Sequence, residues 1–348
     1  MDALPEFQLL RPRTLGEALA ARTAHPGSQL IGGGTDLLVN IRRGIVAPPV
    51  LLDMTGVSEL TQISADEQRL EIGASATLVD VAAHPGVVTN YPTVAQAAHG
   101  VAGPTQRNMG TVGGNLCLDT RCIFYNQSTW WRAANNHCLK TTGDVCYVAP
   151  KSHGVCFATF SGDLAPALLV LGAQIDLAGP GGRRTLPLAD FYIGHARHDT
   201  ASGDGKNYLA LAPDEIVIAV RAKHTPRLRS GYDKIRIRRS IEYPVAGVAV
   251  ALTRDDDALA DLRVAFTGTN PRPVLLEGTA ALCGSPLDER VLAGLDALVR
   301  DQIMAMKTTF TPGHYRRRVA GVLARRLVAR LWAQGSEIRD QGSGLATA

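Results

Sequence analysis

The first half of the chain alternates short apolar segments with short segments of helical periodicity. Strands are predicted at residues 28–31, 50–54 and 69–74, where apolar positions are continuous or alternate with a period of two. Helices are predicted at residues 15–22, 77–83 and 93–98. Thr14 followed by Glu17 has the spacing of a capping box, and Thr77 is placed to cap the second helix. Short alternating elements of this kind are typical of a mixed α and β domain.

The second half begins with further strands and ends in long helices. Strands are predicted at residues 173–177, 215–220, 243–252 and 262–268, one helical turn at 279–283, and helices at 288–306 and 314–332. The apolar run 164–172 fits either a strand or a helix. Because strands follow one another before the helices begin, the second unit is predicted to be α+β with an antiparallel sheet.

These patterns divide the chain into two folded units. The predicted boundaries are 1–226 for the first domain (subdomains about 1–55 and 56–226, with a cysteine-rich insert at 116–160), 227–334 for the second domain and 335–348 for a tail. The polar segment 194–207 is predicted to be a flexible surface loop. The tail is rich in Gly and Ser, which predicts disorder.

The last predicted helix has an apolar face bordered by arginines. The apolar face contains Val319, Val322, Leu323, Leu327, Val328 and Leu331. The arginines around it are Arg316, Arg317, Arg318, Arg325, Arg326 and Arg330. Two interpretations remain open: the face packs on the domain's own core while the arginines are solvated, or it contacts a partner subunit.

Composition and charge narrow the class of protein. The chain has 348 residues, 45% of them hydrophobic, a net charge of +4 and few aromatic residues. These totals suit two or three domains, and without a nucleic-acid-binding motif no nucleic-acid partner is expected. No apolar run approaches the roughly 18 residues of a membrane span, and residues 1–6 lack the features of a signal peptide. We therefore expect a cytoplasmic protein without a membrane partner, in which clustered cysteines more often bind a metal than form disulfides.

Two glycine-rich segments are candidates for binding an anion. Residues 32–34 are three consecutive glycines directly after a predicted strand, and residues 103–115 contain four more together with Thr and Asn side chains. Glycine allows backbone N–H groups to approach a phosphate, although each segment alone is also compatible with a plain tight turn. Neither a GxGxxG fingerprint nor a P-loop is present. Two such segments in one domain favour a dinucleotide ligand.

The insert holds most of the cysteines. Cys117, Cys122, Cys138, Cys146 and Cys156 lie in it, out of 6 in the chain. No pair has the C-x₂-C spacing of zinc ribbons or bacterial ferredoxins. Four thiolates could bind an iron–sulfur cluster, and the aromatic residues of the insert could shield it from water. The alternatives are reduced cysteines buried as small hydrophobic residues, or a zinc site.

Three motifs together resemble the FAD-binding subunits of molybdenum hydroxylases, the group that includes xanthine and CO dehydrogenases. They are Leu30–Asp36, Thr105–Asn115 and Ser161–Pro166, and Tyr315-Arg316-Arg317 at the start of the last helix agrees with them. The resemblance implies an α+β fold. Its first domain would be a vanillyl-alcohol oxidase (PCMH)-type FAD-binding domain of two subdomains. A C-terminal α+β domain of the CO dehydrogenase flavoprotein type would follow.

The resemblance also implies which residues contact FAD. The residues around the diphosphate would be Leu30, Ile31, Gly32, Gly33, Gly34, Thr35 and Asp36. Those along the ribityl and adenosine parts would be Val101, Ala102, Gly110, Thr111, Val112, Gly113, Gly114, Asn115 and Asp163. Val217 and Lys234 would lie near the isoalloxazine, where a lysine could stabilise negative charge on the reduced ring. No catalytic acid, base or nucleophile is assigned to this chain.

The insert makes the segment between Asn115 and Asp163 roughly forty residues longer than in most of the family. In this respect the chain resembles the flavin subunits of 4-hydroxybenzoyl-CoA reductases, whose insert holds an additional [4Fe–4S] cluster. Carried over by position, the ligands would be Cys122, Cys138, Cys146 and Cys156. Cys117 is left out, because the ordinary family has an apolar residue near the flavin at that position.

This closer resemblance implies an electron-transfer subunit of a heterotrimer that also dimerises. Its partners would be a large subunit with the molybdenum cofactor, a small [2Fe–2S] subunit and a ferredoxin that donates electrons. The enzyme would reductively dehydroxylate 4-hydroxybenzoyl-CoA to benzoyl-CoA. One alternative is a hydroxylase flavin subunit that passes electrons outward to NAD⁺ or O₂. The other is a zinc-stabilised scaffold without flavin.

Overall fold

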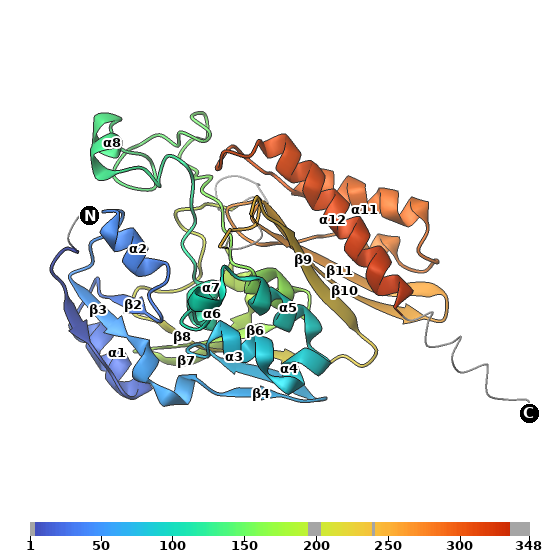
Figure 1. Ribbon diagram of the computed structural model, residues 1–348, viewed down its shortest axis with the longest axis horizontal. Helices are drawn as coiled ribbons and strands as arrows, with labels where there is room; N and C mark the ends of the chain where they lie inside the picture. Colours follow the sequence, from blue (N-terminus) through green and yellow to red (C-terminus); the bar gives the residue numbers. More distant parts are fainter. Residues whose placement is uncertain (1–3, 194–202, 239–240, 335–348) are drawn as a thin grey trace, which may run out of the picture.

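Three β-sheets organise the chain, two in its N-terminal two thirds and one in its C-terminal third (Figure 1). The computed structural model describes residues 4–193, 203–238 and 241–334. The predicted tail 335–348 and residues 194–202 of the predicted surface loop lie outside the described residues.

The first sheet is small and parallel, with the order β1-β3-β2. Its strands are β1 (Gln8–Leu10), β2 (Gln29–Ile31) and β3 (Val50–Asp53), and its helices are α1 (Leu15–Ala24) and α2 (Leu37–Arg42), with 3₁₀ turns at Met54–Gly56 and Ser58–Leu60. The predicted cap of α1 is present, because the Thr14 side chain accepts a hydrogen bond from the Glu17 amide. The first glycine segment connects β2 to α2 and therefore lies where this sheet faces the rest of the domain.

The second sheet is antiparallel, with the order β4-β5-β8-β6-β7. Its strands are β4 (Ile63–Ala65), β5 (Arg69–Gly73), β6 (Gln174–Gly179), β7 (Gly182–Pro187) and β8 (Ile216–Lys223). The helices of this part are α3 (Leu78–Ala83), α4 (Pro85–Asn90), α5 (Pro92–Gly100), α6 (Pro104–Arg107), α7 (Val112–Leu116), α9 (Leu164–Leu169) and α10 (Leu188–Phe191). The ambiguous apolar run at 164–172 forms α9, which is buried on every side in the largest hydrophobic core.

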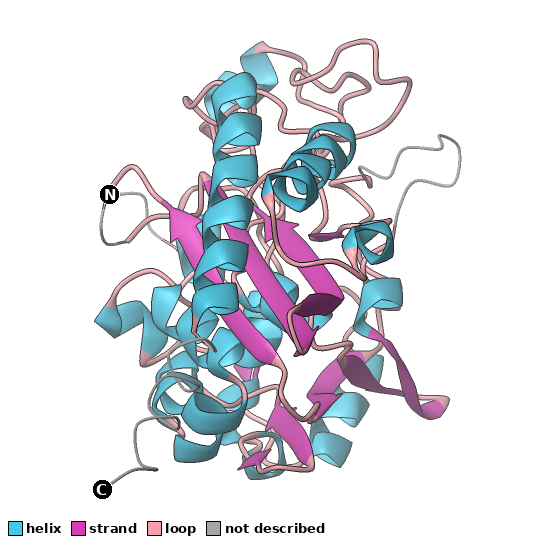
Figure 2. Ribbon diagram, turned by 90° about the vertical axis from the view of Figure 1, so that its right-hand side faces the viewer, coloured by secondary structure: helices cyan, strands magenta, loops and turns pink. Residues whose placement is uncertain are grey.

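The third sheet forms the C-terminal domain and is antiparallel, as predicted, with the order β12-β11-β10-β9. Its strands are β9 (Arg229–Ile235), β10 (Ala246–Asp255), β11 (Ala258–Thr267) and β12 (Val274–Leu275). A 3₁₀ turn at Thr279–Leu282 leads to α11 (Glu289–Gln302) and α12 (Gly313–Ala333). Figure 2 shows the two long helices lying over one face of this sheet, and their apolar residues share its core.

The structure corrects two predictions about these helices. The helix predicted to reach Met306 ends at Gln302, because Ile303 is extended and Met304 donates its amide to the Asn270 side chain. In α12, Val322 is exposed, whereas Arg316, predicted among the bordering arginines, is buried. The face toward the sheet contains the buried residues Ala320, Ala324, Leu327, Val328 and Leu331, and the predicted Val319 and Leu323 pack against the same core while partly buried. Small residues and one buried arginine thus replace part of the expected aliphatic stripe.

The cysteine-rich insert projects from the first domain and lies above α2 in the view of Figure 1. Its one regular element in the described residues is α8 (Thr129–Ala134), capped by the Ser128 side chain. The two ends of the insert are joined by a β-bridge between Arg121 and Thr159. Arg132 donates to the carbonyl of Gly44 at 2.7 Å, which attaches α8 to the chain after α2.

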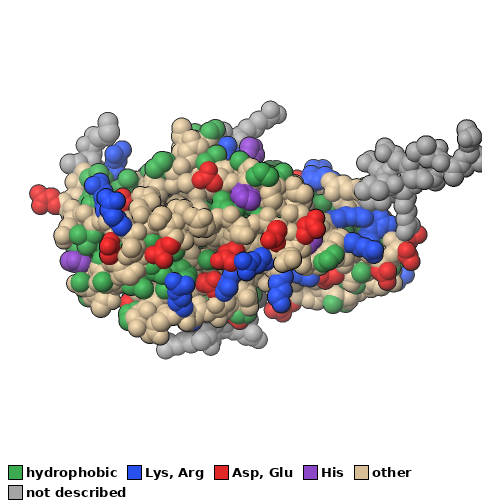
Figure 3. Space-filling model, turned by 90° about the horizontal axis from the view of Figure 1, so that it is seen from below, with side chains coloured by type: hydrophobic (Ala, Val, Ile, Leu, Met, Phe, Trp, Pro, Cys, Tyr) green, Lys and Arg blue, Asp and Glu red, His purple; other side chains and the backbone are tan. Residues whose placement is uncertain are grey.

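Acidic and basic side chains are mixed on the face of the molecule shown in Figure 3, so neither sign of charge dominates there. In the described part of the chain, no helix has both the length and the apolar character needed to cross a membrane.

Candidate flavin cavity and cysteine loop

A cavity of about 680 Å³ opens between the first two sheets, next to both glycine segments. The predicted flavin contacts that line it are Leu30, Ile31, Gly32, Gly33, Gly34, Thr35, Asp36, Val101, Ala102, Gly110, Thr111, Gly113, Gly114, Asn115, Asp163 and Val217. Two predicted contacts do not line it: Val112 is buried in the core, and Lys234 lies behind Asp163. The volume lies within the range of ligand pockets, and the wall mixes apolar side chains with backbone and polar groups.

The two glycine segments contact each other directly. A Cβ at Gly33 would lie 1.9 Å from the carbonyl oxygen of Met109, and a Cβ at Gly32 would lie 2.7 Å from Oγ1 of Thr111. Of the first three glycines only Gly34 has a positive φ, at 69°. Glycine is therefore required at Gly33 for close backbone approach rather than for an unusual conformation.

Backbone hydrogen bonds fix the second glycine segment to the end of β5. The amide of Val112 donates to Ala76 at 3.0 Å, and that of Gly113 donates to Ala74 at 2.8 Å. Thr111 caps α7 by accepting from the Gly114 amide. These contacts join the second glycine segment to the second sheet and form one wall of the cavity.

A buried acid faces the cavity from the start of α9. Asp163 accepts from Nζ of Lys234 at 2.8 Å and from the hydroxyl of Tyr232 at 2.5 Å. The side chains of Asp163 and Lys234 are only 4% and 5% exposed, and both Lys234 and Tyr232 come from β9 of the C-terminal domain. Burial, and then the negative charge of Asp163, raise the pKa of Tyr232 well above its ordinary value. The positive charge of Lys234 thus lies behind Asp163, and it is the carboxylate of Asp163 that lines the cavity.

A second polar group lies around Asp36. Its carboxylate accepts from the Tyr243 hydroxyl at 3.1 Å, from the Asn40 amide at 2.7 Å and from Nη2 of Arg121 at 3.4 Å. Nη1 of Arg121 is buried and has no hydrogen-bond partner among the described residues, and Arg121 lines the cavity. An acceptor such as a phosphate oxygen would complete its hydrogen bonding. The residues present therefore fit an anionic dinucleotide such as FAD.

The four cysteines predicted as ligands are buried close to one another. Cys122, Cys138 and Cys156 share one small core with Tyr125, and Cys146 contributes to the neighbouring core. All six cysteines lie within the described residues, and none forms a disulfide. Cys117 instead lines the flavin cavity, where burial raises the pKa of its thiol to about 12.

Backbone amides point at these sulfur atoms. The amide of Tyr125 donates to Sγ of Cys122 at 3.3 Å, and the amide of Ala158 donates to Sγ of Cys156 at 3.4 Å. Burial raises the pKa of Cys122 to about 11, whereas the neighbouring Cys156 thiol lowers that of Cys146. The thiols thus lie in a dry environment, and amides are already oriented toward the sulfurs of Cys122 and Cys156.

The arrangement of the four cysteines has different consequences for a zinc site and for a four-iron cluster. Among the described residues, no three His, Cys, Asp or Glu side chains are arranged to hold one metal ion. A tetrahedral zinc site would bring its sulfurs to roughly 3.8 Å from one another. A four-iron cluster binds each thiolate through a different iron, so its ligands are spread more widely. Cys122, Cys138, Cys146 and Cys156 would be the residues to hold such a cluster, and backbone amides are directed at two of their sulfur atoms.

Comparison with known proteins identifies the family. Residues 5–222 match the model of the FAD binding domain in molybdopterin dehydrogenase, and residues 231–331 match the CO dehydrogenase flavoprotein C-terminal domain. The chain is an FAD-binding subunit of the molybdenum hydroxylase family. The predicted fold class is confirmed, and so is the FAD cofactor.

Relatives of this FAD-binding subunit match along nearly their whole length. It is 30% identical over 329 residues to the aldehyde oxidoreductase FAD-binding subunit of Escherichia coli (strain K12), covering 91% of this chain and 97% of that one. It is 26% identical over 340 residues to the carbon monoxide dehydrogenase medium chain of Hydrogenophaga pseudoflava, covering 95% and 98%. The structure of Cu,Mo-CO dehydrogenase in its cyanide-inactivated form has the same fold, with a TM-score of 0.76, 23% identity and coverage of 96% and 100%.

Three residues of the site were missed by the sequence reasoning. Arg121 and Tyr243 border the cavity. Lys140 connects the cavity to the cysteine loop, which is the cysteine-rich insert of residues 116–160. Their partners lie in segments far apart in the chain, so no local spacing could have marked them.

Proposed function

We propose that this chain is the electron-transfer subunit of a three-subunit enzyme of the 4-hydroxybenzoyl-CoA reductase type. When bound, FAD and a [4Fe–4S] cluster supply redox centres that accept and pass on electrons one at a time. Electrons from a ferredoxin would cross this chain to [2Fe–2S] and molybdenum centres in partner subunits. There, two electrons and two protons would convert 4-hydroxybenzoyl-CoA to benzoyl-CoA and water.

The observation that carries the proposal is the group of four buried thiols next to the flavin cavity. Cys122 directly follows Arg121, which lines the cavity, so the chain passes from one candidate centre to the other within one residue. A cluster at the surface end of a flavin subunit is an entry point for electrons. A low-potential donor suits this direction, because removing an aromatic hydroxyl group reductively needs strongly reducing electrons.

This chain's own residues have supporting roles in that proposal. The two glycine segments and Arg121 would hold the diphosphate, and Asp163 with Lys234 would set the charge near the isoalloxazine. Cys122, Cys138, Cys146 and Cys156 would bind the cluster, and Phe124, Tyr125 and Tyr147, which pack in the core with the cysteines, would keep water away from it. The large molybdenum subunit, the small [2Fe–2S] subunit and the dimeric assembly are proposed from the resemblance and from the relatives' names as medium chains.

A second candidate function is favoured by the relatives themselves. The 30% identical relative is a subunit of an aldehyde oxidoreductase, and two others belong to carbon monoxide dehydrogenases. In that case electrons would leave through the flavin toward NAD⁺ or O₂, and the insert would carry no redox centre.

Iron and sulfide analysis of the anaerobically purified chain separates the two candidates. We expect about four irons and four acid-labile sulfides per FAD, with an EPR signal after reduction by dithionite. Cys138→Ser should lose the iron and keep FAD, whereas Cys283→Ser, which alters the cysteine outside the insert, should keep both. Flavin without iron in the unmodified chain would refute the reductase proposal, and iron retained in Cys138→Ser would refute the ligand assignment.

A further inference from the structure

A buried lysine lies inside the cysteine loop. Lys140 comes between Cys138 and Cys146 in the chain, and its side chain is only 7% exposed. Its ammonium donates to Oδ1 of Asp119 at 2.8 Å, to Oγ1 of Thr120 at 2.6 Å and to the carbonyl of Gly205 at 2.7 Å. Three acceptors use all three N–H groups, which compensates for burying the charge.

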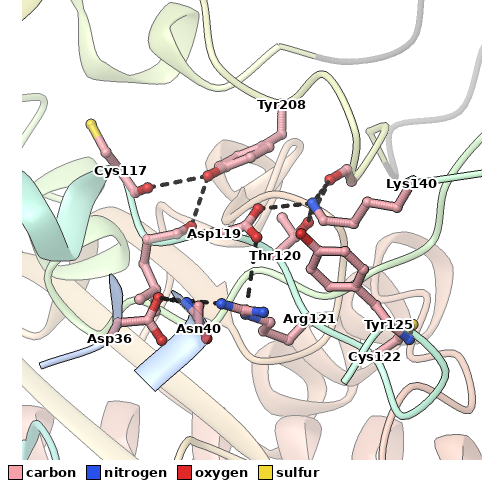
Figure 4. Close-up of polar contacts among 12 residues, drawn as sticks. Asp36, Asn40, Cys117, Asp119, Thr120, Arg121, Cys122, Tyr125, Lys140 and Tyr208 are labelled. Carbon is pink, nitrogen blue, oxygen red and sulfur yellow. Dashed lines mark hydrogen bonds and ion pairs between the residues drawn. The ribbon is translucent and has the colours of Figure 1, made fainter. Parts of the chain in front are cut away.

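The acceptor Asp119 belongs to the wall of the flavin cavity. Figure 4 shows the line of charges that starts at Lys140 and passes through Asp119 and Arg121 to Asp36. Arg121 lies 4.0 Å from Asp119 and 3.4 Å from Asp36. Alternating charges thus connect Lys140 in the cysteine loop to Asp36 at the end of the first glycine segment, and these two residues are far apart in the sequence.

The same ammonium is also attached to the cysteine side. Gly205, which accepts from Lys140, donates its amide to the carbonyl of Cys156 at 2.7 Å. The amide of Cys156 donates to Asp204 at 3.1 Å. The rings of Tyr125 and Tyr208 lie 5.2 and 5.8 Å from Nζ, within the distance of cation–π attraction. Lys140 therefore contacts Asp119 of the cavity wall, Gly205 next to Cys156, and two aromatic rings.

We propose that Lys140 is a positioning residue that fastens the cysteine loop to the flavin cavity and keeps a fixed positive charge between the two. Loss of the ammonium would leave the acceptors Asp119, Thr120 and Gly205 without their common donor, so the loop would separate more easily from the cavity wall. The positive charge would also stabilise the more negative, reduced form of a cluster bound by the cysteines. Only this second consequence rests on the proposed function.

The fastening is tested on the full-length chain without iron, by hydrogen–deuterium exchange of peptides from residues 117–160. In Lys140→Met we expect amides of this segment to exchange roughly tenfold faster, while peptides from α9 keep their protection. Lys151→Met, which removes an exposed lysine of the same insert, is the matched control and should match the unmodified chain. Equal exchange in Lys140→Met and Lys151→Met would overturn the proposal.

A second variant guards against a general folding defect. Asp119→Asn removes the charge at the other end of the pair without changing the size of the side chain. If Lys140→Met does not fold, faster exchange confined to residues 117–160 in Asp119→Asn supports the proposal, and unchanged exchange overturns it.

The effect of the Lys140 charge on the cluster is tested by a separate measurement, on chains that hold the cluster. An EPR-monitored redox titration should give a lower midpoint potential for Lys140→Met than for Lys151→Met, with FAD content unchanged. Identical potentials would overturn the charge role. Absence of iron from the unmodified chain would instead refute the proposed function, and the exchange experiment would still decide whether Lys140 fastens the loop.

Discussion

At the scale of single residues, the shape of the cavity depends on glycines that allow the two glycine segments to contact each other. The sequence suggested that Gly32, Gly33 and Gly34 let backbone N–H groups approach a phosphate. The structure gives Gly33 a different reason, since its missing side chain is the space in which Met109 of the second segment lies. Two backbones that touch at this point define one edge of the cavity, so the distance between them determines its shape.

Gly33→Ala should therefore impair flavin binding without adding any bulk to the cavity itself. A Cβ 1.9 Å from the Met109 oxygen forces the two glycine segments apart. We expect the Kd for FAD to rise by more than about tenfold, measured by titrating the flavin-free chain. Gly181→Ala is the control, because a Cβ there meets no atom within 4 Å and should leave the affinity unchanged. Equal affinities for the two variants would contradict this account of Gly33.

At the scale of elements, α12 is held by a charge rather than by its apolar face alone. Arg316 is 1% exposed, and its hydrogen-bond partners in the described part of the chain are neutral oxygens. They are the carbonyls of Val245, Met306 and Gly268 and the hydroxyl of Thr308. Burial lowers the pKa of Arg316 to about 10, so the side chain is charged at neutral pH.

This arginine also reaches the cysteine loop. Thr308 shares a hydrogen bond of 2.7 Å with Thr159, and its carbonyl accepts from the amide of Ile123 at 2.9 Å. Both ends of the insert are thus attached to the segment that Arg316 holds in place. The start of α12 supports the loop as well as its own domain.

Arg316→Met should destabilise the protein because it leaves buried carbonyls without donors. We expect a loss of about 3 kcal/mol in the free energy of unfolding, measured by urea denaturation. The neighbouring Arg317 is exposed, and Arg317→Met should change stability by less than about 0.5 kcal/mol. A similar small effect for both variants would show that the buried hydrogen bonds of Arg316 contribute little.

At the scale of the whole molecule, the sequence was sufficient for many of the longer strands and helices, but not for short elements such as β1, β4 and α2 or for contacts between distant segments. The cap at Thr14, the apolar strands and the antiparallel C-terminal sheet follow from local spacing, and the structure contains them. The burial of Arg316 and Lys140 could not be predicted, because each has acceptors in segments remote in the sequence, Val245 and Gly268 for Arg316 and Gly205 for Lys140. A charged residue looks solvent-exposed in a sequence until the acceptors that surround it are known.

The flavin contacts were predicted from family motifs, and the cavity shows why the prediction was incomplete. Motif residues such as Gly33 and Asn115 line it, because glycine and amide patterns are visible in the sequence. Arg121 was missed because it lies in the insert, outside every motif. Lys234 was predicted to lie near the isoalloxazine, and its ion pair with Asp163 depends on how the two domains pack, which periodicity does not specify.

The junction between the two domains contains a buried ion pair, and its strength can be measured. Asp163 belongs to the FAD-binding part and Lys234 to the C-terminal sheet, and they meet at 2.8 Å with almost no solvent contact. Asp163→Asn leaves the ammonium buried without its counter-charge, which should cost about 3 kcal/mol. Among the described residues, Lys234→Met leaves the carboxylate with the Tyr232 hydroxyl as its one hydrogen-bond donor, and a comparable loss is expected.

The double variant Asp163→Asn/Lys234→Met should be more stable than the sum of the two losses predicts, because it removes both uncompensated charges together. We expect a coupling of about 1–3 kcal/mol between the two positions in urea unfolding of the flavin-free chain. The flavin must be absent, since any ligand that binds only the folded state adds its own stabilisation. Asp163→Asn combined with Lys223→Met, an exposed lysine at the end of β8, should show simple addition. If the Asp163 and Lys234 losses also add without coupling, the pair does not hold the domains together, and the packing of β9 on α5 and of β10 and β11 on α9 must do so.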